Sequence, residues 1–368
     1  MKNVCTVLQR NVNVLIENGV FSAIKTFSEY GCAFDELRVL PIDDTDRIRK
    51  TIDGLKSEYE NILLLTENRA LKTVANVLSG TLGQGSFLGG VNGAGMYSDG
   101  QTTLYLLSID DDETGLEYAK NVCLPNFQKR YGVRFDKTVV RAMGANIAHV
   151  EQLLRKAQSI DGGRIKYLHA RKYDEDVLEI RYDDSAPKML VDDVVRLFAD
   201  GLGDTVYALT DASLEEQLIE LLKLRRKKIS VAESFTGGGI ARRLTSVSGA
   251  SEVYFEGLNT YNEESKLRRL GVSEYTLRTV GAVSDQTAYE MALGLLNTGV
   301  CDVAIATTGL AGPNTDRSML PIGLSFIAVG TKEQISVYRY KFDGNRKEIT
   351  EKAINYALFL AYKQLKKL

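Results

Sequence analysis

The chain has 368 residues, which is too long for one ordinary hydrophobic core and therefore predicts two or three domains. It is 44% hydrophobic and 26% charged with only 5 prolines, a composition typical of a folded protein rather than a disordered or fibrous one. Its net charge of -2 provides no general attraction to nucleic acid or to an anionic membrane, so we expect neither as a partner.

Two further features of the sequence limit its class. No run of about 18 apolar residues occurs and the start shows no signal-peptide pattern, so we expect a cytoplasmic protein. The cysteines lie far apart, which fits neither a disulfide framework nor a paired metal site, and reduced, mostly buried thiols are expected at Cys5, Cys32, Cys123 and Cys301. With only His149 and His169 available, both in amphipathic segments, a histidine triad or histidine-rich metal site is not expected.

The N-terminal part alternates helix-like and strand-like runs, which predicts an α/β layer with parallel strands. In chain order, the expected elements are an amphipathic stretch at 16–30, a strand at 37–42, a helix at 44–58, a strand at 61–66, a helix-like stretch at 70–79, a strand at 102–109 and a helix with its exit at 114–132.

Between these elements, eight glycines lie from Gly80 to Gly100. A phosphate-binding loop is one interpretation, but the segment follows a helix-like stretch and its GxGxxxG spacing misses the dinucleotide fingerprint. A flexible or hairpin connection is favoured.

The middle part predicts a compact α+β unit. Its expected elements are strands at 137–144, 164–172, 177–183 and 205–209 and helices at 146–158 and 187–203. It contains no catalytic pattern, so a spacer or docking role is expected.

A second α/β domain begins near Thr210. Ser213 and Glu216 form a capping-box pattern, and the helix that follows ends in a basic run, 225–228, that suits the last turn of a helix better than a nucleic-acid patch. The expected elements after it are a strand at 229–233, a helix at 239–247, strands around 253–261, helices up to 297, strands at 301–309, 323–330 and 335–342, and a last helix from about 346.

The segment AESFTGGG, which contains Ser234, is the most informative part of the chain. A strand, a glycine-rich turn and a helix would place Ser234 at the positive end of a helix, where backbone N–H groups can receive an oxyanion. A serine in such a turn also serves as an ordinary helix N-cap.

A nucleophilic serine needs a base, and with histidine nearly absent, a lysine, a tyrosine or a carboxylate is left. Tyr261 and Lys266 follow at a strand-to-helix junction and could reach the same end of the sheet. A lysine acts as base only if its pKa falls from about 10.4 toward neutrality; otherwise Lys266 is a solvated helix charge.

Two other segments should lie at the same rim, because ligands of open α/β sheets gather at the carboxyl ends of strands. The loop 306–313, ATTGLAGP, offers hydroxyls and amides, although it is also a Gly-Pro turn. Arg346, at the start of the last helix, could clamp a phosphate or simply be exposed.

The order and spacing of AESFTGG, GAS (249–251), TYNEESKLRRLGV, GAVS (281–284), IATTGLAGP, PIGLSFIAV and FDGNR resemble the C-terminal domain of the CinA family, the nicotinamide mononucleotide deamidases. This resemblance implies hydrolysis of the carboxamide to nicotinate mononucleotide and ammonia. It implies Ser234 as the acyl-carrying nucleophile and Tyr261 and Lys266 as its activating pair. The implied substrate contacts are Thr236, Gly237, Gly238, Ser251, Thr308, Gly309 and Arg346.

The resemblance extends toward the N-terminus. It implies a KH-like domain at 136–209 and a degenerate molybdopterin-binding-type domain at 1–135, ahead of the amidase domain at 210–368. The glycine-rich acidic loop of the molybdopterin-binding-type domain is here ENRALKT, and LLSIDDDETG replaces its Leu-Pro-Gly turn, which argues against pyrophosphatase activity. In the amidase domain, Glu263 stands where the family commonly has asparagine, and 314–317 departs from a glycine-rich run.

We therefore expect a multi-domain α/β hydrolase that forms a homodimer, takes a small nucleotide substrate in pyridine nucleotide salvage and needs no metal or cofactor for its amidase. A divalent metal would be needed only if the N-terminal domain were active. Two alternatives stay open: a bifunctional protein that also cleaves ADP-ribose-type pyrophosphates, and a non-catalytic nucleotide-binding protein. A contact of about 3 Å between Ser234 and the Lys266 amine favours catalysis, whereas a solvent-facing lysine favours binding.

Overall fold

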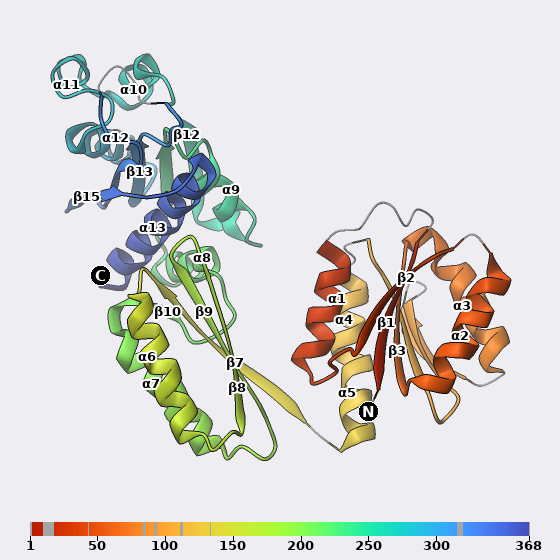
Figure 1. Ribbon diagram of the computed structural model, residues 1–368. Helices are drawn as coiled ribbons and strands as arrows, with labels where there is room; N and C mark the ends of the chain where they lie inside the picture. Colours follow the sequence, from red (N-terminus) through yellow and green to blue (C-terminus); the bar gives the residue numbers. More distant parts are fainter. Residues whose placement is uncertain are drawn as a thin grey trace. The chain divides into compact units, whose positions relative to one another are not determined.

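The protein is described here by a computed structural model that covers residues 2–9, 18–42, 44–83, 86–91, 94–110, 113–132, 134–314 and 319–367. The chain divides into two compact units (Figure 1). The first contains residues 1–137 and 181–187, and the second contains residues 138–180 and 188–368.

The first unit is built on a six-stranded sheet with the strand order β2-β1-β3-β6-β5-β4. Its first four strands in this order are parallel, whereas β5 and β4 add as an antiparallel hairpin. The strands are β1 (Asn3–Gln9), β2 (Glu36–Pro41), β3 (Asn61–Thr66), β4 (Phe87–Val91), β5 (Ala94–Ser98) and β6 (Thr103–Ser108). The helices are α1 (Asn18–Glu29), α2 (Thr45–Glu58), α3 (Asn68–Leu82), α4 (Glu113–Tyr118) and α5 (Leu124–Tyr131).

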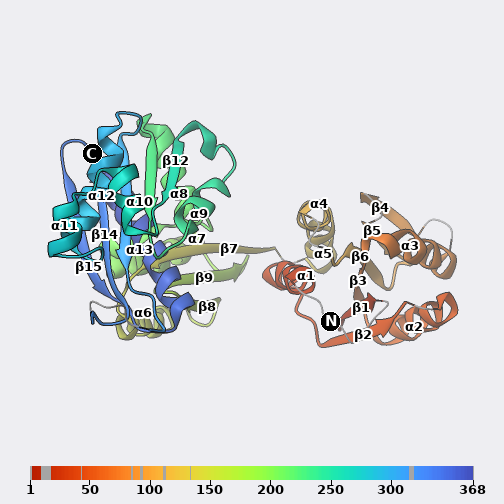
Figure 2. The ribbon, with the colours of Figure 1, turned by 90° about the horizontal axis from the view of Figure 1, so that it is seen from above.

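Helices cover both faces of this sheet. In both views α2 and α3 lie on one face, and α1, α4 and α5 lie on the other (Figures 1 and 2). Because side chains alternate along a strand, the apolar run of β3 supplies both cores: Leu63 and Leu65 pack on the α1 side, and Ile62 and Leu64 pack on the α2 side. The predicted α/β layer is confirmed.

Two features of this unit were not expected from the sequence. The central strand β1 (Asn3–Gln9) precedes every element predicted there. The single helix expected at 114–132 is interrupted by a π-helical turn, Ala119–Cys123, directly before α5. Pro125 explains the interruption, because it has no N–H to donate to the carbonyl four residues before it. The glycine-rich segment forms the β4–β5 hairpin, in agreement with the favoured interpretation.

The middle part has a four-stranded sheet in the order β10-β7-β9-β8 and two helices that pack on each other. Its strands are β7 (Phe135–Met143), β8 (Ile165–Lys172), β9 (Glu175–Asp183) and β10 (Val206–Ala208). Its helices are α6 (Ile147–Ile160), α7 (Lys188–Leu202) and the 3-10 turn Gly203–Thr205. The α+β content agrees with the prediction, whereas the KH-like and molybdopterin-binding-type relationships stay predictions.

The C-terminal sheet has the order β12-β11-β13-β14-β15, in which β12, β11 and β13 are parallel and β14 and β15 antiparallel. Its strands are β11 (Ile229–Glu233), β12 (Tyr254–Asn259), β13 (Val303–Gly309), β14 (Leu324–Gly330) and β15 (Ile335–Lys341). Its helices are α8 (Leu214–Arg225), α9 (Gly239–Thr245), the 3-10 turn Ala250–Glu252, α10 (Glu263–Leu270), α11 (Glu274–Thr279), α12 (Asp285–Asn297) and α13 (Arg346–Lys367).

Two cores sandwich the C-terminal sheet. Helices α8, α9 and α13 bury the valine and isoleucine side of β11 and β13, and α12 buries their alanine side. The predicted capping box is present, with Ser213 and Glu216 each bonded to the other's backbone amide. The parallel strands β11 and β13 end side by side, so the loops that follow them meet at one rim.

Two observations concern the whole described part of the chain. All four cysteines are buried and free, as predicted. No helix in the ranges given above is both long and apolar enough to cross a membrane.

Candidate active site

Ser234 follows β11 directly, at the carboxyl end of the C-terminal sheet. Its backbone N–H donates to the carbonyl of Thr307 at 3.1 Å, which joins it to the end of the neighbouring strand β13. The side chain is only 7% exposed, but it reaches a pocket of about 370 Å³ that opens at this rim. The predicted meeting of the two loops is therefore present.

Lys266 supplies an amine to this serine. Its Nζ donates to the Ser234 Oγ at 3.0 Å and to the backbone carbonyl of Thr260 at 2.7 Å, with a weaker contact of 3.4 Å to the carbonyl of Tyr261. The Thr260 and Tyr261 carbonyls can accept hydrogen bonds from the two N–H groups of a neutral amine. The lone pair of that amine can then face the serine hydroxyl, which is the arrangement a general base needs.

Burial sets the protonation of Lys266. The side chain is 1% exposed, and burial lowers its pKa from 10.5 to about 8, against the opposing effect of the negative charge of Glu263. A buried ammonium loses hydration that two carbonyl groups only partly replace, so burial shifts the equilibrium of Lys266 toward the neutral amine. This pKa lies near the range that a general base needs in order to work close to neutral pH.

Helix packing holds Lys266 in place. Asn262 caps α10 by accepting from the Glu264 amide, so that Lys266 lies in the first turns of a helix directly behind the rim. The end of α10 lies against α12, where a side chain at Gly294 would clash with the Leu270 carbonyl at 2.0 Å. Glycine at this position permits the close approach of the two helices.

A buried carboxylate, Glu233, occupies the start of the helix behind Ser234. It is 1% exposed, and its two oxygens accept from the amides of Gly238, Ile240 and Ala241 at 2.9–3.1 Å. The expected use of this helix terminus for an oxyanion is therefore not what the structure provides. Within the described turn, the amides of Phe235 and Thr236 are the ones without a hydrogen bond, and these can receive an oxyanion.

An arginine and a tyrosine lie at the mouth of the pocket. Arg346 donates from Nη1 to the Gly312 carbonyl at 2.6 Å and from Nη2 to the Tyr261 hydroxyl at 3.2 Å. Tyr261 is 63% exposed, and toward Lys266 it offers its backbone carbonyl rather than its phenol. The structure thus brings Ser234 and Lys266 together and directs the Tyr261 hydroxyl to Arg346.

The residues expected to contact substrate fall into two groups. Thr308, Gly309 and Arg346 line the pocket, with the Thr308 hydroxyl bonded to the Ala282 carbonyl at 2.6 Å. The buried Thr236 hydroxyl instead lies 2.8 Å from that of Thr307.

The remaining expected contacts lie elsewhere. Gly237 and Gly238 are not among the residues that line the pocket; their φ values of 61° and 90° lie in the region that favours glycine, and their contact with substrate stays a prediction. Ser251 precedes β12 and so lies at the amino end of the parallel strands, whereas Ser234 lies at their carboxyl end.

Several residues that line the pocket were not proposed as site residues from the sequence. They are Phe235, Glu263, Ala282, Val283, Leu310, Ala311, Gly312 and Asn314. The motifs GAVS and TGLAGP, noted in the sequence, contain five of these residues. The side-chain directions of Phe235 and Glu263 could not be read from a motif. Residues 315–317, part of the segment 314–317 that differs from the family's glycine-rich run, lie outside the described residues.

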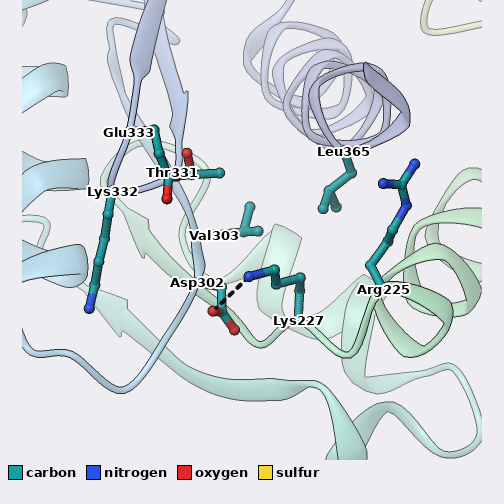
Figure 3. A pocket seen from close by; sticks show the side chains of 8 residues that line it. All are labelled: Arg225, Lys227, Asp302, Val303, Thr331, Lys332, Glu333 and Leu365. Atoms are coloured by element: carbon teal, nitrogen blue, oxygen red, sulfur yellow. Dashed lines mark hydrogen bonds and ion pairs between the residues drawn. The ribbon is translucent and has the colours of Figure 1, made fainter. Parts of the chain in front are cut away.

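A second pocket, of about 320 Å³, lies at the opposite end of the sheet's strands from the Ser234 rim (Figure 3). It is formed at the amino end of β13 and at the turn after β14, where Lys227 pairs with Asp302 at 3.3 Å and Arg225 and Lys332 point apart. The Lys227–Asp302 pair joins two partly exposed side chains, whereas the Ser234 rim holds a buried amine beside a hydroxyl, so the Ser234 rim is the better candidate for an active site. No cluster of three metal-ligating side chains occurs among the residues in the described ranges.

Comparison with known proteins identifies the family of the C-terminal domain. The sequence model of the CinA C-terminal domain family matches residues 211–365. A structure of the competence/damage inducible protein CihA from Agrobacterium tumefaciens is 35% identical, and the match covers 93% of that chain and 42% of this one, with a TM-score of 0.40. The chain belongs to the CinA family.

The resemblance extends beyond this domain in longer relatives. A protein of Caldicellulosiruptor saccharolyticus is 34% identical over 64% of this chain, and a CinA-like protein of Endomicrobium trichonymphae is 31% identical over 72% of it. The matches span 58% and 63% of the length of these two relatives. The C-terminal domain of the CinA family is associated with deamidation of nicotinamide mononucleotide.

Proposed function

We propose that the C-terminal domain hydrolyses the carboxamide of nicotinamide mononucleotide to nicotinate mononucleotide and ammonia, with Ser234 as the nucleophile. The observation that carries this proposal is the 3.0 Å contact between the Ser234 hydroxyl and the buried amine of Lys266. A binding protein would have no need to bury a lysine beside a serine, because the desolvation of its charge costs stability.

In the first half of the reaction, neutral Lys266 accepts the hydroxyl proton while the Ser234 oxygen attacks the amide carbon. The carbonyl oxygen becomes an oxyanion, for which the amides of Phe235 and Thr236 are available. The ammonium of Lys266 then returns the proton to the amide nitrogen. The C–N bond breaks, ammonia leaves, and an ester joins the substrate to Ser234.

In the second half, a water molecule replaces ammonia. Lys266 accepts a proton from the water as its oxygen attacks the ester, and it gives a proton to the Ser234 oxygen as the C–O bond breaks. The product is a carboxylate, and the enzyme is regenerated. Arg346 at the pocket mouth is suited to bind the substrate phosphate.

The decisive experiment measures ammonia release from nicotinamide mononucleotide by the full chain. Ser234→Ala should abolish release while the protein stays folded, because the hydroxyl contributes about 1 kcal/mol to the turn but is required for the acyl-enzyme. Ser246→Ala, at the exposed end of α9, is the matched control and should retain activity. EDTA should leave the rate unchanged. Turnover in Ser234→Ala would contradict the proposal.

A further inference from the structure

Glu263 places a carboxylate in the wall of the Ser234 pocket. It is the first residue of α10, one turn before Lys266, and its side chain is exposed to the pocket. Among the cations of the described chain, none forms an ion pair with it, whereas the adjacent Glu264 pairs with Arg268 on the outer surface. The pocket therefore offers one carboxylate without a partner.

Among the described residues that line this pocket, three have an amine, a guanidinium or a carboxylate group. Lys266 lies at its base against Ser234, Arg346 lies at its mouth and is held by Gly312 and Tyr261, and Glu263 lies on the wall. The charge of Glu263 acts on Lys266 and raises its pKa, opposite to the effect of burial. Glu263, Ser234 and Lys266 line the same pocket, so the carboxylate faces the space in which the ring of a bound carboxamide would lie.

We propose that Glu263 is the specificity-determining residue of this site, and that it selects a carboxamide carried on a positively charged heteroaromatic ring over the same carboxamide on a neutral ring. This inference rests on the proposed amidase function. A cation placed beside an unpaired carboxylate in a partly desolvated pocket gains a favourable interaction. Arg346 can take an anionic group at the other end, so the pocket suits a ligand with a cationic ring and an anionic phosphate.

The same charge acts on the product. Hydrolysis replaces a neutral carboxamide by a carboxylate at the Ser234 end of the pocket, whose wall carries Glu263. Like charges at close range are unfavourable. Glu263 therefore weakens product binding as well as strengthening substrate binding.

The test compares two ligands that differ in ring charge but share the phosphate, the ribose and the carboxamide: nicotinamide mononucleotide and its 1,4-dihydro form, whose ring is neutral. Dissociation constants are measured by calorimetry at pH 8 with the full chain carrying Ser234→Ala, so that no turnover occurs. The measurement is repeated with Glu263→Gln added and with Glu264→Gln added as the matched control.

We expect Glu263→Gln to weaken binding of the oxidised nucleotide by on the order of tenfold, the effect of one charge pair several Å apart at a partly exposed site, and to leave binding of the dihydro form unchanged. Glu264→Gln should change neither. In the chain with Ser234 intact, Glu263→Gln should also move the acid limb of kcat/KM to lower pH, because Lys266 loses a stabilising negative charge.

Equal losses for both ligands, or no loss for either, would overturn the proposal, since Glu263 would then serve only structure. Retained binding of the dihydro form shows that a loss for the oxidised form does not come from unfolding. Failure of the proposed function gives a different result: the chain with Ser234 intact releases no ammonia from nicotinamide mononucleotide, whatever the binding constants are.

Discussion

The Nζ of Lys266 lies 3.0 Å from the Oγ of Ser234, although 32 residues separate the two in the chain. Ser234 is held at the end of β11, and Lys266 is held by α10 behind the neighbouring strand β12. The short contact exists because parallel strands align their carboxyl ends, so that the turn after one strand meets the helix after the next. Activity and stability should both depend on this pair in ways that can be measured.

Amidase activity should rise with pH through about 8. Burial lowers the pKa of Lys266 to about 8, and only the neutral amine can accept the Ser234 proton, so the enzyme should be inactive well below that pH and active above it. The measurement is kcat/KM for nicotinamide mononucleotide between pH 6 and 10. Lys266→Arg, which stays protonated throughout, should be inactive at every pH. A profile that is flat across this range would count against Lys266 as the base.

Burial of Lys266 should also make stability depend on pH. Its folded pKa is lower than its unfolded value, so between about 8 and 10.5 the unfolded chain binds more protons and stability rises with pH. The rise should amount to about 3 kcal/mol and should be absent from Lys266→Met. Urea unfolding at pH 7.5, 9 and 10.5 measures the difference between the two proteins. If that difference stays constant across the three pH values, Lys266 is not a buried titrating group.

Tyr261→Phe should affect substrate binding more than chemistry. The Tyr261 hydroxyl contacts Arg346, and only its backbone carbonyl, which the substitution keeps, contacts Lys266. We expect KM to rise several-fold, the loss of one hydrogen bond to a charged group, with kcat within about threefold of the original. Steady-state kinetics separate the two constants. A kcat reduced by more than about 100-fold would show that the phenol takes part in proton transfer, as the family resemblance implies.

The full chain should hydrolyse ADP-ribose poorly or not at all. A pyrophosphatase needs free backbone amides and metal-binding carboxylates near the phosphates. At the end of β3, the Asn68 amide is not free for a phosphate because it donates to the Asp110 carboxylate at 2.7 Å, and Glu67 forms an ion pair with Arg69. Residues 111–112, which follow Asp110, lie outside the described residues.

The measurement for this prediction is AMP release from ADP-ribose with magnesium, cobalt or manganese. Ser234→Ala serves as the control, because any AMP released by the N-terminal unit must be independent of the proposed amidase nucleophile. Robust turnover would show that the N-terminal unit is a working enzyme despite its altered loops.

The sequence by itself determined the alternation of helices and strands, most element positions and the residues able to carry the chemistry. The capping box at Ser213 and Glu216 could be predicted because its two hydrogen bonds join residues three apart. The near absence of histidine narrowed the base for Ser234 to a lysine, a tyrosine or a carboxylate, and Lys266 was among the candidates. Such signals are local, since propensity and short motifs depend on neighbouring residues.

Tertiary structure decided which way each side chain points. Glu233 fills the start of α9 and leaves other amides for an oxyanion, the Tyr261 hydroxyl turns to Arg346, and Ser251 lies at the amino end of the strands, away from Ser234. A motif gives the order of such residues but not the edge or face on which each lies. The position of each residue on the sheet depends on strand order and helix packing between segments far apart in the chain. The energies of these long-range contacts cannot be read from any short stretch of sequence.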